Sequence, residues 1–110
     1  RQIAAVHAAE LLYTARPIDA GRALTMGLLN DVVPADQLMT RALETADQIA
    51  GNAPLAVEAT LAGVRRLSGL SIDEAYREQE VLGRPLRRTE DAREAQQAFV
   101  EKRRPVFVGR

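Results

Sequence analysis

The chain has 110 residues, 46% of them apolar and 27% charged, with equal numbers of acidic and basic side chains; this is the size and composition of one small globular domain. It has no cysteine and a single histidine, His7, which excludes disulfide scaffolds, thiolate metal sites, thiol nucleophiles and histidine clusters. No apolar run approaches the roughly 20 residues that span a bilayer, and the first residues lack the layout of a signal peptide. We therefore expect a cytoplasmic protein with no membrane partner and no bound metal.

The charges are unevenly distributed along the chain. Residues 1–60 carry four basic and seven acidic side chains, whereas residues 61–110 carry eleven basic and eight acidic ones. The basic excess is modest and does not gather on one predicted helix, as it would in a helix-turn-helix DNA-binding protein. We therefore expect no nucleic-acid partner.

The first predicted elements are two helices. Apolar residues recur every three or four positions over residues 2–15, which is the spacing of one helix face. Pro17 ends this helix, because the residue before a proline is pushed toward extended geometry. A short second helix is predicted from an N-cap at Asp19 to about Met26, where Gly27 stands at the position of a left-handed closing residue.

A short strand is predicted over residues 28–33. This stretch is apolar, contains β-branched residues and ends at Pro34. A lone strand leaves its backbone groups unpaired, and no second strand is evident in the sequence.

Four longer helices follow, over residues 35–50, about 54–68, 72–82 and 90–104. Pro54 lies in the first turn of its helix, where its missing N–H does no harm. Ser71 and Glu74 have the spacing of a capping box, and Thr89 is the N-cap of the last helix, which Pro105 ends. These helices carry no nucleotide-binding glycine motif and no nucleophile elbow, so the residues alone predict no active site.

Two blocks of the sequence, in this order and at this separation, carry a family resemblance. The first runs from Glu10 to Pro34. The second consists of Thr89, Asp91, Glu94, Ala98, Phe99, Val100, Glu101, Lys102, Arg103, Pro105, Phe107 and Gly109. Together with residues 52–56, they resemble the C-terminal region of the enoyl-CoA hydratase/isomerase (crotonase) superfamily over essentially the whole chain. Ala15 and Ala95 stand where many members have glycine.

The resemblance implies a mainly α fold, namely the C-terminal helical trimerisation part of a crotonase-like α/β fold of repeated ββα turns. Residues 1–34 would be the end of the crotonase core, including the short strand near 28–33. Residues 35–110 would be the C-terminal helical oligomerisation domain. The implied assembly is a homotrimer or a hexamer built as a dimer of trimers.

The implied activity is on acyl-CoA thioesters, with hydration of a 2-enoyl-CoA as the reaction and no cofactor required beyond the coenzyme A of the substrate. The oxyanion-hole amides and catalytic glutamates of the family match no position here. We therefore expect the 110 residues to be a C-terminal fragment that is inactive alone. The alternative is a stand-alone helical oligomerisation or docking module without catalysis.

The resemblance also implies a binding role for Phe99 and Lys102. Their matching positions lie where the last helix reaches the acyl-CoA of a neighbouring subunit, with Phe99 near the adenine and Lys102 at the ribose 3′-phosphate. Positions i and i+3 lie close to one helix face, and Lys102 is the only lysine among fifteen cationic residues. The alternatives are a helix-packing aromatic and a lysine that compensates the helix dipole.

Overall fold

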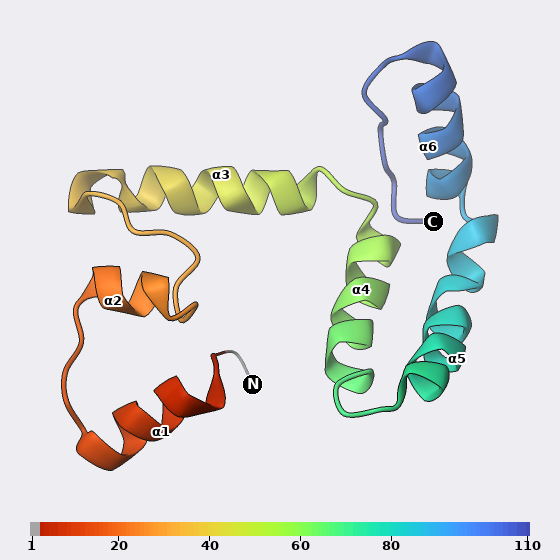
Figure 1. Ribbon diagram of the computed structural model, residues 1–110. Coiled ribbons are helices and arrows are strands. Elements are labelled where there is room, and N and C mark those ends of the chain that lie inside the picture. The colour runs from red at the N-terminus through yellow and green to blue at the C-terminus, as the bar shows by residue number, and fades with distance from the viewer. Residues whose placement is uncertain (1–2) are drawn as a thin grey trace. The chain divides into compact units, whose positions relative to one another are not determined.

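A computed structural model describes residues 3–110, which form helices connected by loops and turns (Figure 1). The chain divides into two compact units, Arg1–Ala42 and Leu43–Arg110, and the boundary lies inside helix α3 (Leu38–Ala50). No described helix is long and apolar enough to cross a membrane.

The first unit contains both short helices that the sequence predicts. They are α1 (Ala5–Thr14) and α2 (Ala20–Thr25); residue 2 of the predicted helix over 2–15 lies outside the described residues. Asp19 caps α2 by accepting a hydrogen bond from the backbone N–H of Arg22 at 2.7 Å. Gly27 has a φ of 78°, so the chain turns left-handed directly after α2, as predicted.

The predicted strand over residues 28–33 is wrong. The segment is a loop, and residues 3–110 contain no strand that could pair with it. The physical reason is that an isolated strand leaves its N–H and C=O groups without partners. The Asp31 carboxylate instead accepts hydrogen bonds from the backbone N–H of Val32 at 2.8 Å and from Arg41 Nε of α3 at 2.7 Å.

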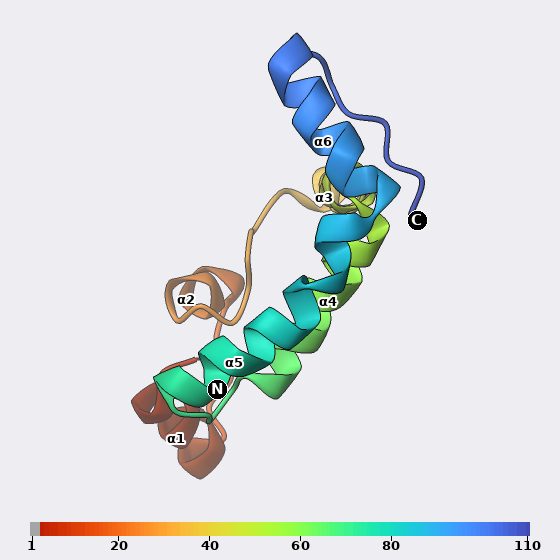
Figure 2. The ribbon, with the colours of Figure 1, turned by 90° about the vertical axis from the view of Figure 1, so that its right-hand side faces the viewer.

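The second unit contains a pair of helices packed side by side. They are α4 (Pro54–Arg66) and α5 (Ile72–Gly83), and both views of the ribbon show them running together (Figures 1 and 2). Gly63 is buried in α4, and a Cβ atom added to it would lie 3.8 Å from Leu82 Cδ1 of α5. Gly63, which has no Cβ atom, therefore lies where the two helices are close.

The predicted caps of the second unit are observed. Pro54 is at the start of α4. Ser71 and Glu74 form both halves of the capping box of α5, with Glu74 N–H donating to Ser71 Oγ and Ser71 N–H donating to Glu74 Oε2. The Ser71 hydroxyl, followed by its backbone N–H, lowers the pKa of Glu74.

The last helix, α6 (Glu90–Glu101), follows a 3-10 turn, η2 (Pro85–Arg88). Thr89 Oγ1 caps α6 by accepting a hydrogen bond from Ala92 N–H at 3.0 Å. The prediction that Pro105 ends this helix is wrong, because Lys102 already adopts a left-handed conformation with a φ of 55°. Beyond this turn the chain folds back along α6 (Figures 1 and 2); residues 105–110 are called the C-terminal tail below.

Few apolar side chains are buried among the described residues. Those with little exposure are Ala23, Met26 and Ala98, and no large side chain is fully enclosed. Many large apolar residues, such as Tyr13 and Ile72, are instead mostly exposed. The helices therefore present broad apolar surface to the exterior, the kind of surface that marks contact with other protein.

Candidate functional site

The two residues singled out from the sequence lie together at the C-terminal end of α6. Phe99 is in the last turn and is 86% exposed, and Lys102 follows the helix and is also exposed. The backbone N–H of Lys102 donates a hydrogen bond to the carbonyl of Phe99 at 3.3 Å. The structure thus places both side chains at one accessible helix end, where a partner or ligand can reach them.

Three backbone hydrogen bonds close the turn at Lys102, and two of them run from the N–H of Lys102 to the carbonyls of Ala98 and Phe99. In the third, the N–H of Arg103 donates to the carbonyl of Ala98 at 3.0 Å. This pattern satisfies carbonyl groups that the end of a helix otherwise leaves unpaired. A left-handed conformation costs an L-residue about 1–2 kcal/mol relative to the right-handed one, so these bonds stabilise a turn that lysine does not favour.

The side chain of Arg103 also stabilises this turn, through hydrogen bonds to two carboxylates of α6. Its Nη1 and Nη2 donate to the two carboxylate oxygens of Glu94 at 2.5 and 3.0 Å, and its Nε donates to Glu101 Oε2 at 2.6 Å. Such a two-point guanidinium–carboxylate pair fixes direction as well as distance. We call Glu94, Glu101 and Arg103 the Arg103 cluster.

The hydrogen bonds of the Arg103 cluster shift the pKa of each of its members. The Arg103 guanidinium, followed by the backbone N–H of Val106, lowers the pKa of Glu94 from 4.5 to about 2. Gln97 and then Arg103 lower the pKa of Glu101, and the two carboxylates raise the pKa of Arg103. All three groups therefore stay charged at neutral pH.

Lys102 differs from Arg103 in its interactions. Within residues 3–110 its side chain makes no hydrogen bond and no ion pair, whereas the charge of Arg103 is engaged by Glu94 and Glu101. An exposed ammonium group without an internal partner is available to an external anion. This arrangement is compatible with phosphate binding, for which lysine acts as a compact point charge.

Asp91 and Glu94 hold the C-terminal tail against α6, a role that sequence reasoning missed. Asp91 is only 2% exposed and accepts hydrogen bonds from the backbone N–H groups of Val108 at 2.7 Å and Gly109 at 2.9 Å. Glu94 Oε1 accepts a third, from Val106 N–H at 2.8 Å. The available signal was their three-residue spacing, which puts both carboxylates on one helix face.

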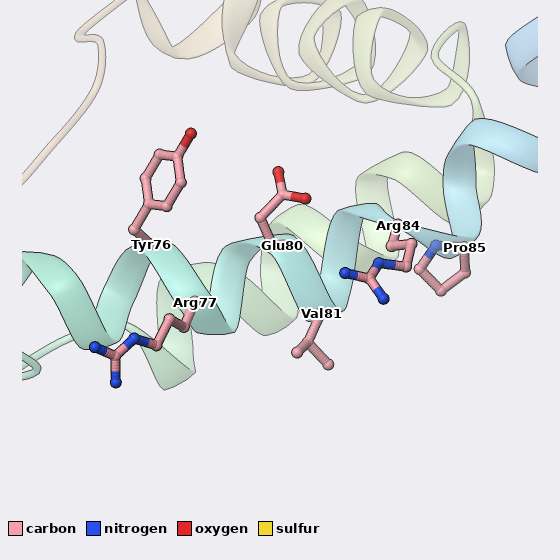
Figure 3. Close-up of a pocket in the computed structure, with 6 residues that line it drawn as sticks. All are labelled: Tyr76, Arg77, Glu80, Val81, Arg84 and Pro85. Carbon is pink, nitrogen blue, oxygen red and sulfur yellow. The ribbon is translucent and has the colours of Figure 1, made fainter.

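The hollow along α5 does not form a second candidate site. The hollow shown in Figure 3, of about 440 Å³, lies along the outer face of α5 and is lined by Tyr76, Arg77, Glu80, Val81, Arg84 and Pro85. The labelled side chains point in different directions, and Glu80 is paired with Arg87 at 2.9 Å. Polar groups that converge on one point, as in a ligand site, are therefore missing from this hollow. No group of three metal-ligating side chains is found among residues 3–110.

A sequence model of the enoyl-CoA hydratase/isomerase family matches residues 1–110. The chain belongs to this family. It is 43% identical over 110 residues to an enoyl-CoA hydratase of Mycobacterium tuberculosis, covering 100% of this chain and 41% of that protein. It is 47% identical over 105 residues to carnitinyl-CoA dehydratase of Proteus mirabilis, covering 92% of this chain and 40% of the relative.

Solved enoyl-CoA hydratases share the fold of this chain. The crystal structure of an enoyl-CoA hydratase from Bacillus anthracis superposes with a TM-score of 0.96 at 34% identity, covering 100% of this chain and 43% of that one. The helices described above are therefore a part of the crotonase fold, as the resemblance in the sequence implied. The chain spans about two fifths of the length of the curated relatives it matches.

Proposed function

We propose that the chain is the C-terminal, subunit-assembling part of an enzyme that acts on acyl-CoA thioesters, with hydration of a 2-enoyl-CoA as the reaction. The observation that carries this proposal is the family match over residues 1–110. The names of the two relatives above, a hydratase and a dehydratase of CoA compounds, agree with it. We expect the enzyme to be cytoplasmic and to need no cofactor beyond the coenzyme A of its substrate.

The proposed reaction needs two kinds of group. Two peptide N–H groups would polarise the thioester carbonyl and stabilise the negative charge that develops as water adds. Glutamates would deliver the water and move the proton. Neither kind matches a position in this chain, so its own contribution would be assembly and binding of coenzyme A.

In this proposal α6 contacts the coenzyme A of a neighbouring subunit in a homotrimer or hexamer. Phe99 packs near the adenine, and Lys102 pairs with the ribose 3′-phosphate. The support is the exposure of both side chains and the lack of an internal partner for Lys102 within the described residues. The exposed apolar helix faces supply the surface on which subunits would assemble.

The decisive experiment uses the enzyme that carries these 110 residues and compares coenzyme A with 3′-dephospho-coenzyme A by titration calorimetry. A hydrogen bond to a charged group contributes about 1.5–3 kcal/mol, so Lys102→Gln should weaken coenzyme A binding about tenfold or more. Binding of the dephospho compound should not change. Arg104→Gln, which removes a neighbouring exposed charge, is the matched control. Equal loss for both compounds would contradict the phosphate contact.

The 110-residue chain alone should not hydrate crotonyl-CoA, since it lacks positions for the oxyanion hole and the glutamates. The loss of the enoyl absorbance on adding the chain is the measurement. Substantial turnover would overturn this part of the proposal.

The second candidate function is a stand-alone helical oligomerisation or docking module. The observation that favours it is the exposure of large apolar residues on α1, including Leu12 at 79% and Tyr13 at 87%. Such a module would self-associate to the same extent with and without coenzyme A. Light scattering under both conditions separates it from the first candidate.

A further inference from the structure

Two left-handed helix ends among residues 3–110, at Ala15 and Lys102, fall on residues other than glycine, and they are held in different ways. Ala15, after α1, has a φ of 50°, and its N–H donates to the carbonyl of Leu11 at 3.0 Å. Lys102, after α6, has the same kind of backbone, but the next residue, Arg103, also ties the turn to Glu94 and Glu101 through three short side-chain bonds. At Ala15 the neighbouring side-chain bond is a neutral one, from the N–H of Arg16 to Thr14 Oγ1 at 3.3 Å, whereas charged side chains of α6 hold the turn at Lys102.

We propose that Glu94 and Arg103 are positioning residues for Lys102: the Arg103 cluster sets the left-handed turn so that the lysine side chain leaves the helix end toward the 3′-phosphate of coenzyme A. This inference rests on the function proposed above. It adds a role for two residues that do not themselves contact the ligand.

The geometry of the cluster explains how the positioning works. The backbone dihedral angles of Lys102 decide the direction in which its Cβ leaves the main chain, and a lysine side chain is long and flexible. Arg103 is adjacent in sequence, so its attachment to Glu94, nine residues earlier, restrains those angles. The attachment is two-pointed, which resists rotation as well as separation.

The Arg103 cluster also gives the two neighbouring cations, Lys102 and Arg103, different partners. Glu94 and Glu101 engage the guanidinium of Arg103, so this cation does not compete with Lys102 for the phosphate. Lysine at position 102 then acts as the point charge and arginine at position 103 as the brace. Because lysine has a single ammonium group and cannot bridge two carboxylates with a planar fork, the two residues are not interchangeable in this arrangement.

The test measures phosphate discrimination, defined as the dissociation constant of 3′-dephospho-coenzyme A divided by that of coenzyme A. It uses the enzyme that carries these residues, in its Glu94→Gln, Arg103→Lys and Glu80→Gln variants. Arg103→Lys keeps the charge and removes the fork. Glu80→Gln, the control, removes an exposed ion pair with Arg87 on α5 and η2 that is remote in sequence from Lys102.

We expect discrimination of about tenfold or more in the unsubstituted enzyme and a loss of most of it in both Glu94→Gln and Arg103→Lys. Binding of the dephospho compound and the discrimination of Glu80→Gln should stay unchanged. If the Arg103 cluster only stabilised the fold, its loss would weaken the binding of both compounds equally, and the ratio of their dissociation constants would stay the same. Circular dichroism checks that the variants are folded. If the Glu94→Gln variant is unfolded, the discrimination of the Arg103→Lys variant decides whether the positioning role holds.

The two failures are distinguishable. If the unsubstituted enzyme binds both compounds equally, the phosphate contact itself is wrong, and the positioning role falls with it. The other case is that the unsubstituted enzyme discriminates and Lys102→Gln removes the discrimination, while Glu94→Gln and Arg103→Lys retain it. The phosphate contact of Lys102 is then supported, and the positioning role of Glu94 and Arg103 is overturned.

Discussion

The Asp91 carboxylate, in the first turn of α6, accepts a hydrogen bond at 2.7 Å from the backbone N–H of Val108, which lies 17 residues later in the chain. The same carboxylate accepts a bond from Gly109 N–H, and the ring of Pro54 lies about 3.5 Å from where a Cβ of Gly109 would be. One buried acid near the start of α6 therefore anchors the C-terminal tail beside both α6 and α4.

Replacing Asp91 should release the tail. Asp91→Asn removes the negative charge and one of the two acceptor oxygens from a site that is 2% exposed. Because hydrogen bonds to charged groups contribute about 1.5–3 kcal/mol, we expect a loss of that order in the free energy of unfolding. Chemical denaturation measures it, and amide hydrogen exchange should accelerate at Val108 and Gly109.

The control for this substitution is Asp73→Asn. Asp73 also lies in the first turn of its helix, α5, but is exposed, so the loss should be limited to the helix-dipole contribution of about 0.3–1 kcal/mol. Unchanged exchange at Val108 and Gly109 in Asp91→Asn would contradict the anchoring role.

Acid should loosen the tail through Glu94. Its pKa is about 2 in the folded chain and ordinarily 4.5. A carboxyl whose pKa is lower in the folded state contributes stability that is complete above the unfolded pKa and is lost as the pH falls toward the folded one. The contribution should therefore be full above about pH 5 and disappear between 4.5 and 2.

Melting temperatures measured from pH 5 down to pH 2 check this expectation. Glu94→Gln should flatten the profile, while Glu58→Gln, at an exposed carboxyl on α4, should follow the unsubstituted chain. Asp31, Glu74 and Glu101 also have lowered pKa values, so the flattening should be partial. If the melting temperature of Glu94→Gln fell with pH in parallel with that of the unsubstituted chain, Glu94 would not contribute to the loss of stability in acid.

Ala15→Gly should stabilise the chain. Ala15 has a φ of 50°, a conformation that costs an L-residue about 1–2 kcal/mol, and glycine avoids that cost while losing about 0.5–1 kcal/mol in conformational entropy. We expect a net gain of about 0.5–1 kcal/mol in the free energy of unfolding. Ala8→Gly, inside α1, should instead lose about 1 kcal/mol, and a loss at both positions would show that the strain at Ala15 is absent.

Gly63 and Gly27 should respond in opposite directions to alanine. At Gly63, inside α4, the new Cβ would lie 3.8 Å from Leu67 Cδ1 and Leu82 Cδ1, an ordinary contact, and alanine favours the helix by about 0.8–1.0 kcal/mol. At Gly27 the space is open, but the φ of 78° makes alanine unfavourable by about 1–2 kcal/mol. Chemical denaturation of the two variants compares them directly, and destabilisation by Gly63→Ala would mean that α4 and α5 cannot accommodate one methyl group.

The ends of the helices were largely predictable from the sequence, and the reason is that caps are local. Asp19, Ser71 and Thr89 each accept a hydrogen bond from the backbone N–H three residues later, so a short stretch of sequence contains the whole interaction. The family was predictable for a similar reason, since the blocks that resemble it are matched residue by residue and do not depend on how the chain folds. The spacing of Phe99 and Lys102 predicted one shared helix face, but α6 ends at Glu101, so Phe99 lies in the helix and Lys102 in the turn after it.

Only the tertiary structure decided the contacts between distant segments. The Arg103–Glu94 fork spans nine residues and the Asp91–Gly109 bond spans eighteen, and periodicity and capping motifs contain no information at that separation. The strand over residues 28–33 failed for the same reason, because a strand forms only with a partner and a partner is a property of the whole fold. The sequence by itself thus determined the helices and the family, whereas the path of the tail, the left-handed turn at Lys102 and the pairing of Arg103 depended on backbone direction and hydrogen bonds that only the folded chain brings together.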